Sequence, residues 1–132
     1  MPYRITGFAR EEILAVKVTF VGEMRALANA FDSSHILESG LDGQKYVYPG
    51  MIVAQDTTTY KYVPYNSSAA YGTGSDTAVG ILDEMLELTN GDQACTPVVH
   101  GQFIEAHCRV YGLTRGVISS TIKTHLKDIQ WV

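Results

Sequence analysis

Histidine and cysteine are the residues of this chain that could hold a metal ion, and their spacing decides whether they can. His100 and His107 lie on one predicted strand, an odd number of positions apart, so their side chains point to opposite faces. The adjacent His107 and Cys108 diverge in the same way. A zinc site would need Cys95 or His35 to join them from elsewhere in the chain. The spacing therefore favours ordinary imidazoles and buried thiols over a metal centre.

Four carboxylates fall close together in the sequence and could supply the acid and base of a hydrolytic reaction. They are Asp83, Glu84, Glu87 and Asp92. Their place on a predicted hairpin beside a tight turn is more typical of a solvated face. Gly72 and Gly74 begin a GxGxxG pattern, but its third glycine would fall at Thr77, and no helix is predicted to follow. We therefore expect no enzyme activity and no cofactor.

Charge and length narrow the remaining classes of function. The 132 residues carry 10 basic and 14 acidic side chains, a formal net charge of −4. A nucleic-acid surface needs clustered Lys and Arg, whereas the basic residues here are scattered. The sequence also lacks a run of about 20 apolar residues that could span a membrane, and a signal-like apolar segment near its start. We expect no binding to nucleic acid or membrane, and one domain over residues 13–132 preceded by an arm at residues 1–12.

Short strands and turns must position these side chains. Alternating polarity over residues 13–20 predicts a half-buried strand. Pro49-Gly50 and the Thr-rich residues 56–59 predict turns, and Pro64 should end a strand because proline cannot donate to a ladder. Residues 78–82 are small and apolar, which predicts a central buried strand. The other predicted strands are 51–55, 60–65, 84–88, 94–99, 101–111 and 129–132, with a loop at 66–77.

Two helices and one hairpin complete the expected fold. Residues 23–31 place apolar side chains at helical spacing, which predicts a short helix whose stripe packs in the core; the stripe is Met24, Leu27, Ala28 and Phe31. Residues 113–127 predict a second helix with Thr114 as N-cap. Asn90-Gly91 predicts a type I′ hairpin. Loop 32–43 should be anchored by Ile36, Leu37 and Leu41. The predicted class is mostly β with one or two short α-helices, an α+β fold.

The tyrosines admit two interpretations. Six of the eight fall between residues 46 and 71, at Tyr46, Tyr48, Tyr60, Tyr62, Tyr65 and Tyr71. Tyrosines on paired strands pack across a sheet. Tyrosine is also enriched where proteins meet, because it buries a large area at low entropic cost. Both interpretations stay open from the sequence, and the second makes Tyr60, Tyr62, Tyr65 and Tyr71 candidate interface residues.

The order of these segments resembles a known family. PGMIVAQDTTTYKYVPYN, a glycine-rich loop, DTAVGIL, a predicted hairpin and VVHGQF follow one another between residues 46 and 132. This order is similar to that of the head decoration proteins of tailed bacteriophages, the family of the phage lambda decoration protein. The matching positions are Gly50, Lys61, Ala78, Gly80, Ile81, Leu82 and Gly101, with a helix at 121–126 and an apolar end at 129–132. Residues 1–45 lie outside the resemblance.

The resemblance implies a structural role in a virion. Such proteins are small, mostly β domains that form homotrimers and sit on the outer surface of the expanded capsid, where they clamp neighbouring capsomers. It implies that the partners are the major capsid protein of a tailed phage and other copies of this chain. The protein would be made in the host cytoplasm and end on the outer capsid surface of the virion.

The arm is the expected capsid-binding element. Tyr3, Ile5 and Phe8 are spaced near the alternation of a strand, so residues 1–12 could add to an exposed sheet edge of the capsid. Alternatively, residues 3–8 form an edge strand of the domain itself. Two other classes of function remain open. One is a small trimeric β enzyme, which would bring Asp76, Asp83 or Glu84 together with His100 or Arg109. The other is a carbohydrate-binding module whose clustered tyrosines line a groove.

Overall fold

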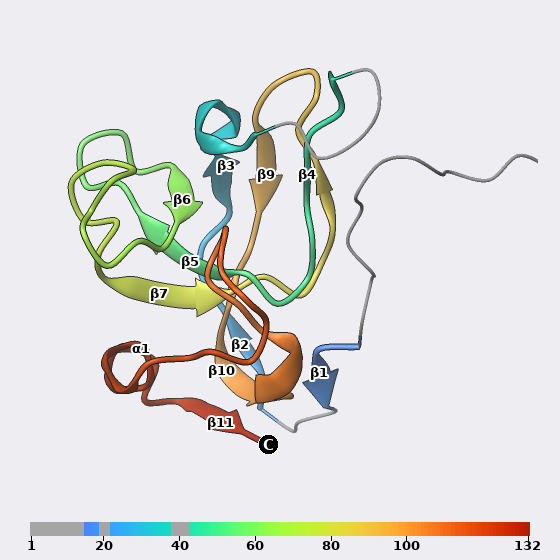
Figure 1. Cartoon of the computed structure of the whole chain (residues 1–132), viewed down its shortest axis with the longest axis vertical. Helices are drawn as coiled ribbons and strands as arrows, with labels where there is room; N and C mark the ends of the chain where they lie inside the picture. Colours follow the sequence, from blue (N-terminus) through green and yellow to red (C-terminus); the bar gives the residue numbers. More distant parts are fainter. Residues whose placement is uncertain (1–14, 19–21, 38–42) are drawn as a thin grey trace, which may run out of the picture.

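The structure is a computed structural model that describes residues 15–18, 22–37 and 43–132. It confirms the predicted class, because the described chain is a β-rich α+β fold whose main sheet curls like half a barrel (Figure 1). The strands are β1 (Lys17–Val18), β2 (Met24–Arg25), β3 (Asn29–Phe31), β4 (Tyr46–Val47), β5 (Ile52–Gln55), β6 (Tyr62–Pro64), β7 (Ala78–Ile81), β8 (Leu86–Glu87), β9 (Gln93–Cys95), β10 (Val98–Phe103) and β11 (Ile129–Trp131). The helices are the 3-10 turns η1 (Ser33–His35) and η3 (Glu105–His107) and the α-helix α1 (Ser120–His125).

Nine of the described strands form the main sheet. Its order is β1-β10-β7-β5-β6-β3-β9, and β2 and β11 also pair with β10. Most neighbours are antiparallel, while β3 with β6 and β10 with β11 are parallel. The first half of β10 pairs with β7 and β2, and its second half pairs with β1 and β11. Because β10 changes partners along its length, the sheet bends there. A separate pair, β4 with β8, completes the described β structure.

Strand β7 lies in the centre of the sheet, as its small apolar residues predicted. It is flanked by β5 and β10. Gly80 is required there because a Cβ at this position would lie 2.9 Å from the carbonyl oxygen of Val98 and 2.9 Å from Cβ of Pro97. Such distances are shorter than van der Waals contact, so only glycine lets the neighbouring chain approach this closely. Ile81 is fully buried on this strand.

The predicted turns on either side of β5 are confirmed. The chain turns at Pro49-Gly50, and Gly50 has a φ of +99°. After β5, the carboxylate of Asp56 accepts a hydrogen bond from the backbone N–H of Thr58 at 2.7 Å and so holds the next turn. Strand β6 ends at Pro64, which lacks the N–H for a further ladder bond.

The centre of the sheet is buried on both faces. Alternate residues of β5 enter two different hydrophobic clusters, with Ile52 and Ala54 in one and Val53 in the other. The first cluster contains Phe103 together with α1 and β11 residues. The second contains Phe31 and residues of β4, β8 and β9. A strand covered on both sides reads as a continuous apolar run, which is why residues 51–54 carry no polar alternation.

The predicted helix at 23–31 is wrong. The segment instead forms β2 and β3, and between them the N–H of Ala26 donates to the carbonyl oxygen of Pro97 at 2.8 Å. Pairing with β10 and β9 satisfies the backbone that a helix would otherwise satisfy internally. Of the predicted stripe only Phe31 is buried, while Met24, Leu27 and Ala28 are exposed.

The anchors predicted for the following loop, residues 32–43, are only partly confirmed. Ile36 is a buried anchor as predicted, whereas Leu37 is exposed, so that prediction is wrong. Leu41 lies outside the described residues.

The predicted hairpin at Asn90-Gly91 is also wrong. Strand β8 pairs with β4, and β9 pairs with β3, so the strands on either side of the turn do not pair with each other. Gly91 has a φ of +126°, but Asn90 is not among the described non-glycine residues with positive φ, so the turn is not type I′. Contacts with more distant strands decided the pairing.

The elements near the C-terminus are shorter than predicted. The strand expected at 101–111 ends at Phe103 and gives way to η3. The helix expected at 113–127 is α1 alone, and its N-cap is Ser119, whose hydroxyl accepts from the N–H of Ile122 at 3.2 Å, rather than Thr114. The last strand is confirmed as β11, and α1 lies beside β7 (Figure 1). In the described ranges no helix has the length and apolar character needed to cross a bilayer.

Candidate interaction surfaces

The four clustered carboxylates do not form one site. Asp83 lies against Lys17 and Arg25: the ammonium of Lys17 donates to it at 2.7 Å, and Nη1 of Arg25 donates at 2.8 Å. Burial alone would raise the pKa of Asp83, but these two cations outweigh it and lower the pKa to about 2. Glu23 accepts from both cations at 3.2 Å. Asp83 therefore links β1, β2 and the end of β7 electrostatically.

Asp92 belongs to a second, separate ion pair. Lys61 donates to its carboxylate at 2.8 Å, and the backbone N–H of Ser33 donates at 2.8 Å. These hydrogen bonds lower the pKa of Asp92 to about 2. Glu84 and Glu87 are exposed. Asp83 and Asp92 thus bind cations from different parts of the chain, Asp83 with Lys17 and Arg25 and Asp92 with Lys61.

The two cysteines are free, buried thiols in different clusters, Cys95 in the one around Phe31 and Cys108 in the one around Phe103. Burial raises the pKa of each thiol to about 12, so neither is a ready nucleophile. Among the described residues, no three His, Cys, Asp or Glu side chains are grouped so that they could hold a metal ion. His125 instead accepts a hydrogen bond from the N–H of Ala78 at Nδ1, 3.1 Å away, and joins α1 to β7.

The candidate interface tyrosines occupy different environments. Tyr62 and Tyr65 are buried, and the hydroxyl of Tyr62 donates to the carbonyl oxygen of Leu27 at 2.6 Å, so these two pack in the core. Tyr60 is exposed on the turn before β6. Tyr71 is partly buried, and its ring lies 6.4 Å from that of Tyr111. The arm residues Tyr3, Ile5 and Phe8 lie outside the described residues.

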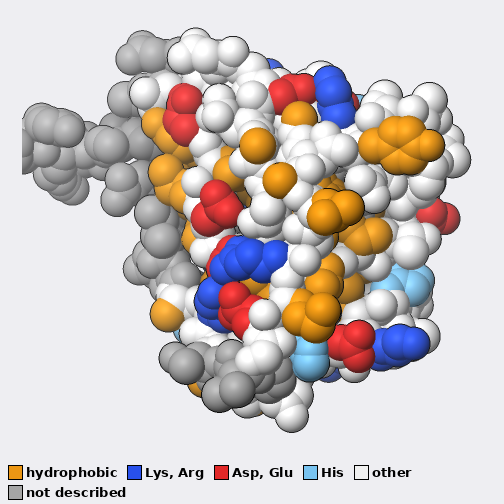
Figure 2. All heavy atoms as spheres, turned by 180° about the vertical axis from the view of Figure 1, so that it is seen from behind, with side chains coloured by type: hydrophobic (Ala, Val, Ile, Leu, Met, Phe, Trp, Pro, Cys, Tyr) orange, Lys and Arg blue, Asp and Glu red, His pale blue; other side chains and the backbone are white. Residues whose placement is uncertain are grey.

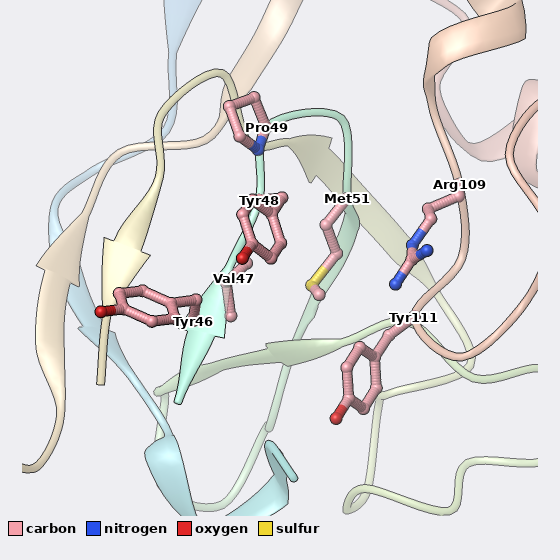
Figure 3. Close-up of a pocket in the computed structure, with 7 residues that line it drawn as sticks. All are labelled: Tyr46, Val47, Tyr48, Pro49, Met51, Arg109 and Tyr111. Carbon is pink, nitrogen blue, oxygen red and sulfur yellow. The ribbon is translucent and has the colours of Figure 1, made fainter. Parts of the chain in front are cut away.

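Tyrosines and one arginine line a small pocket beside β4. Figure 3 shows Tyr46 and Tyr48 on one side and Arg109 and Tyr111 on the other, with the Met51 thioether between them. Val47 and Pro49 complete the lining. The volume is about 40 Å³, too small for a sugar ring and enough for the tip of a side chain. None of the tyrosines named as candidate interface residues lines this pocket, whereas Tyr65 lines the larger hollow described next.

A larger, apolar hollow lies on the other side of Tyr111. Its volume is about 280 Å³. The residues that line it come from the turn after β6, from the loop after η3 and from α1; they are Tyr65, Asn66, Ser67, Val110, Tyr111, Leu113, Val117, Ser119 and Ile122. None of these lining residues is charged. At its rim Leu113 is 56% exposed and Val117 is 59% exposed. Exposed aliphatic side chains around a hollow are typical of interaction surfaces, so this hollow is a candidate for one.

Three polar atoms of the residues that line the apolar hollow bind the chain's own backbone. Oδ1 of Asn66 accepts from the N–H of Ser68 at 2.9 Å, and the Ser119 hydroxyl caps α1. The Tyr111 hydroxyl accepts from the N–H of Leu37 at 2.8 Å. These three atoms are therefore engaged within the chain. The sequence did not reveal this hollow, because residues 101–127 were predicted as one strand and one helix.

A second exposed apolar surface is the segment of residues 24–28, which comprises β2 and the residues that join it to β3. Leu27 is 89% exposed, and Met24 is 58% exposed. Hydrophobic side chains also reach the surface at several separate places on the face seen in Figure 2, among charged ones. The sequence pattern singled out Met24 and Leu27, but it predicted them as part of the core-facing stripe of a helix.

Comparison of the chain with protein-family models, with curated proteins and with solved structures gives no match.

Proposed function

We propose that this protein is a structural virion protein that binds the outside of an expanded tailed-phage capsid as a homotrimer and stabilises it. In this proposal the chain acts through surfaces rather than through a reaction. Its partners are the major capsid protein and its own copies.

The observation that carries the proposal is the presence of exposed apolar side chains at separate places on one small domain. Leu27, Leu113 and Val117 are largely exposed and come from two distant parts of the chain. A protein that cements a shell must contact both its own copies and the capsid, so it needs more than one such surface. A shell presents many equivalent sites, so a trimer that makes several weak contacts at once binds more tightly than any single contact would.

The segment that resembles decoration proteins supports the proposal through its packing. Gly50 and Gly80 match the family's glycine positions, and both lie where a Cβ would meet a backbone carbonyl oxygen at under 3.0 Å. Ile81 and Leu82, also matched, are fully buried. Four of the matched positions, Gly50, Gly80, Ile81 and Leu82, are therefore tightly packed.

The test uses heads of the phage whose genome carries this sequence, expanded and stripped of decoration protein. Purified protein is first measured by size-exclusion chromatography with light scattering and is then sedimented with the heads. We expect a trimer that pellets with the heads and raises the temperature at which they rupture.

Heads that already carry a full complement of decoration protein are the matched control, and they should bind no more of it. A monomer that stays in the supernatant with stripped, expanded heads would contradict the proposal.

A further inference from the structure

We propose that Asn90 is a site of spontaneous covalent modification, at which the side-chain amide is lost after attack by the backbone nitrogen of Gly91, and that the product weakens the hold of Asp92 on η1. The proposal is independent of the function proposed above. It needs no enzyme and no cofactor, because both reacting groups lie in adjacent residues of the turn between β8 and β9. It also assigns a chemistry to the Asn-Gly pair, which does not form the hairpin that the sequence predicted.

The reaction consumes one water molecule and releases one molecule of ammonia. The nitrogen of Gly91 forms a bond to Cγ of Asn90, the bond from Cγ to Nδ2 breaks, and the proton of the Gly91 N–H leaves with Nδ2 as ammonia. Water then opens the resulting five-membered cyclic imide at either of its two carbonyls. One opening gives aspartate, and the other gives isoaspartate, in which the side-chain methylene becomes part of the backbone. Attack within one chain is efficient because the two reacting groups are already neighbours.

The side chain of Asn90 is available for this reaction. Asn90 is exposed. Its amide has no hydrogen-bond partner among the residues that the structure describes. The amide can therefore rotate toward the nitrogen of Gly91 without breaking a contact within the described chain.

The surroundings of Gly91 leave room for the cyclic imide. No atom lies within 4 Å of the position that a Cβ would take at Gly91, and glycine itself has no side chain to hinder ring closure. The attacking nitrogen is held by one hydrogen bond, in which the Gly91 N–H donates to the carbonyl oxygen of Leu88 at 3.2 Å. This distance is longer than the usual value of about 2.9–3.0 Å, so the bond restrains the nitrogen only weakly.

The other two asparagines of the chain are held more firmly and precede bulkier residues. Oδ1 of Asn66 accepts from the N–H and the hydroxyl of Ser68, each at 2.9 Å, and from the N–H of Ala70 at 3.3 Å. Asn29 lies on β3, where pairing with β9 fixes the backbone, and the Cβ of Ala30 stands beside the nitrogen that would attack. Asn29 and Asn66 therefore serve as internal references for the rate at Asn90.

The modified residue would lie next to an anchor of the fold. The carboxylate of Asp92 accepts from the N–H and the hydroxyl of Ser33, each at 2.8 Å, and from Lys61 at 2.8 Å. Isoaspartate in place of Asn90 adds a methylene to the backbone shortly before Asp92. The carboxylate of Asp92 would then be displaced, so its hydrogen bonds to η1 should open more often.

The experiment follows the full, folded chain during incubation in mildly alkaline buffer, which favours loss of the proton from the attacking nitrogen. Peptide mass mapping measures the conversion of each asparagine to the acid, and labelling with an isoaspartyl methyltransferase identifies isoaspartate. Conversion at Asn90 should be at least about tenfold faster than at Asn29 or Asn66, since only Asn90 combines a free amide with a following glycine. Asn90→Gln is the control, because its longer side chain would have to close a less favourable six-membered ring, and it should show no comparable conversion at position 90.

Equal rates at the three asparagines would overturn the proposal, as would an Asn90 that stays unchanged in the folded chain. Conversion of Asn90→Gln at the native rate would also contradict the mechanism.

The effect on Asp92 has a separate measurement. Hydrogen exchange at the N–H of Ser33 should be at least about fivefold faster in the purified isoaspartyl form than in Asn90→Asp, because that variant carries the new charge on a backbone of normal length. Equal exchange in the two proteins would mean that isoaspartate does not weaken the hold of Asp92 on η1.

Discussion

The centre of the sheet and the segment 24–28 both carry apolar side chains, but the first buries them and the second exposes most of them. In β5 and β7, Ile52, Val53 and Ile81 have no exposed surface. In the segment, Leu27 is almost wholly exposed although the sequence around it has the apolar spacing of a core helix. An apolar pattern therefore indicates which side chains a segment could bury. Whether they are buried depends on the strands with which the segment pairs.

The difference lies in where the backbone finds its hydrogen bonds. The central strands have neighbours on both edges and clusters on both faces. The segment is held by strands at each end, and its exposed apolar side chains, Met24 and Leu27, belong to neither cluster. Asp83 joins the two regions, since it follows β7 and binds Lys17 and Arg25.

The largest expected effect is on the free energy of unfolding, and it should differ between the two regions. Ile81→Ala removes a fully buried side chain and should lower the free energy of unfolding by roughly 2–5 kcal/mol. Leu27→Ala, an aliphatic truncation at an exposed site, should change it by less than about 0.5 kcal/mol in the monomeric chain. Urea denaturation of both variants at low protein concentration measures the contrast. A loss below about 1 kcal/mol for Ile81→Ala would mean that β7 is peripheral.

The close approach at β7 gives the next effect. Gly80→Ala would press its Cβ against the carbonyl oxygen of Val98 and against Pro97, and should cost about 1–3 kcal/mol. Gly101→Ala is the matched control on β10, because the nearest atoms there belong to side chains, at 3.2 Å or more, that can shift. The melting temperature of Gly80→Ala should be well below that of Gly101→Ala. Equal melting temperatures would count against the tight packing of β7 on the chain before β10.

The ionic link between the regions should appear as a pH dependence. The folded-state pKa of Asp83 is lowered to about 2 from an ordinary value of 3.8, so its stabilising contribution is complete above about pH 4. It is lost as the pH falls from about 4 to about 2. The contribution is at most about 2 kcal/mol, because Arg25 is partly exposed and water screens it.

Asp83→Asn should flatten this part of the acid profile measured by chemical denaturation. Asp92→Asn is the control, and its effect should be smaller because its partner Lys61 is more exposed than Lys17. An unaltered acid profile in Asp83→Asn would mean that the link does not hold the two regions together.

The smallest expected effect on stability comes from the N-terminal arm. Deletion of residues 2–9 should leave the melting temperature and the trimer unchanged, yet abolish binding to expanded heads. The reason is that Tyr3, Ile5 and Phe8 are expected to add to an edge of the capsid rather than to the domain. If the deletion unfolds the domain or dissociates the trimer, residues 3–8 belong to the fold itself.

The sequence by itself determined the turns and strand ends that depend on neighbouring residues, and the segments whose composition allows only a buried position. Pro49-Gly50 and Asp56 set turns through φ and side-chain hydrogen bonds that neighbours supply, and Pro64 ends β6 because it has no N–H. Residues 78–82 are too small and apolar to face water, so a central strand followed from composition. The buried thiols Cys95 and Cys108 followed in the same way.

Only the tertiary structure decided the pairings between distant segments. Asn90-Gly91 favours a local hairpin, but β8 pairs with β4 and β9 pairs with β3. These pairings bury Leu86 and Cys95 in the cluster around Phe31. Likewise Met24, Leu27 and Phe31 share one pattern, yet only Phe31 meets a cluster. The apolar hollow depends on residues 65, 111 and 122, which no window of sequence contains together. A surface assembled from three separate segments is invisible to periodicity, since periodicity describes one segment at a time.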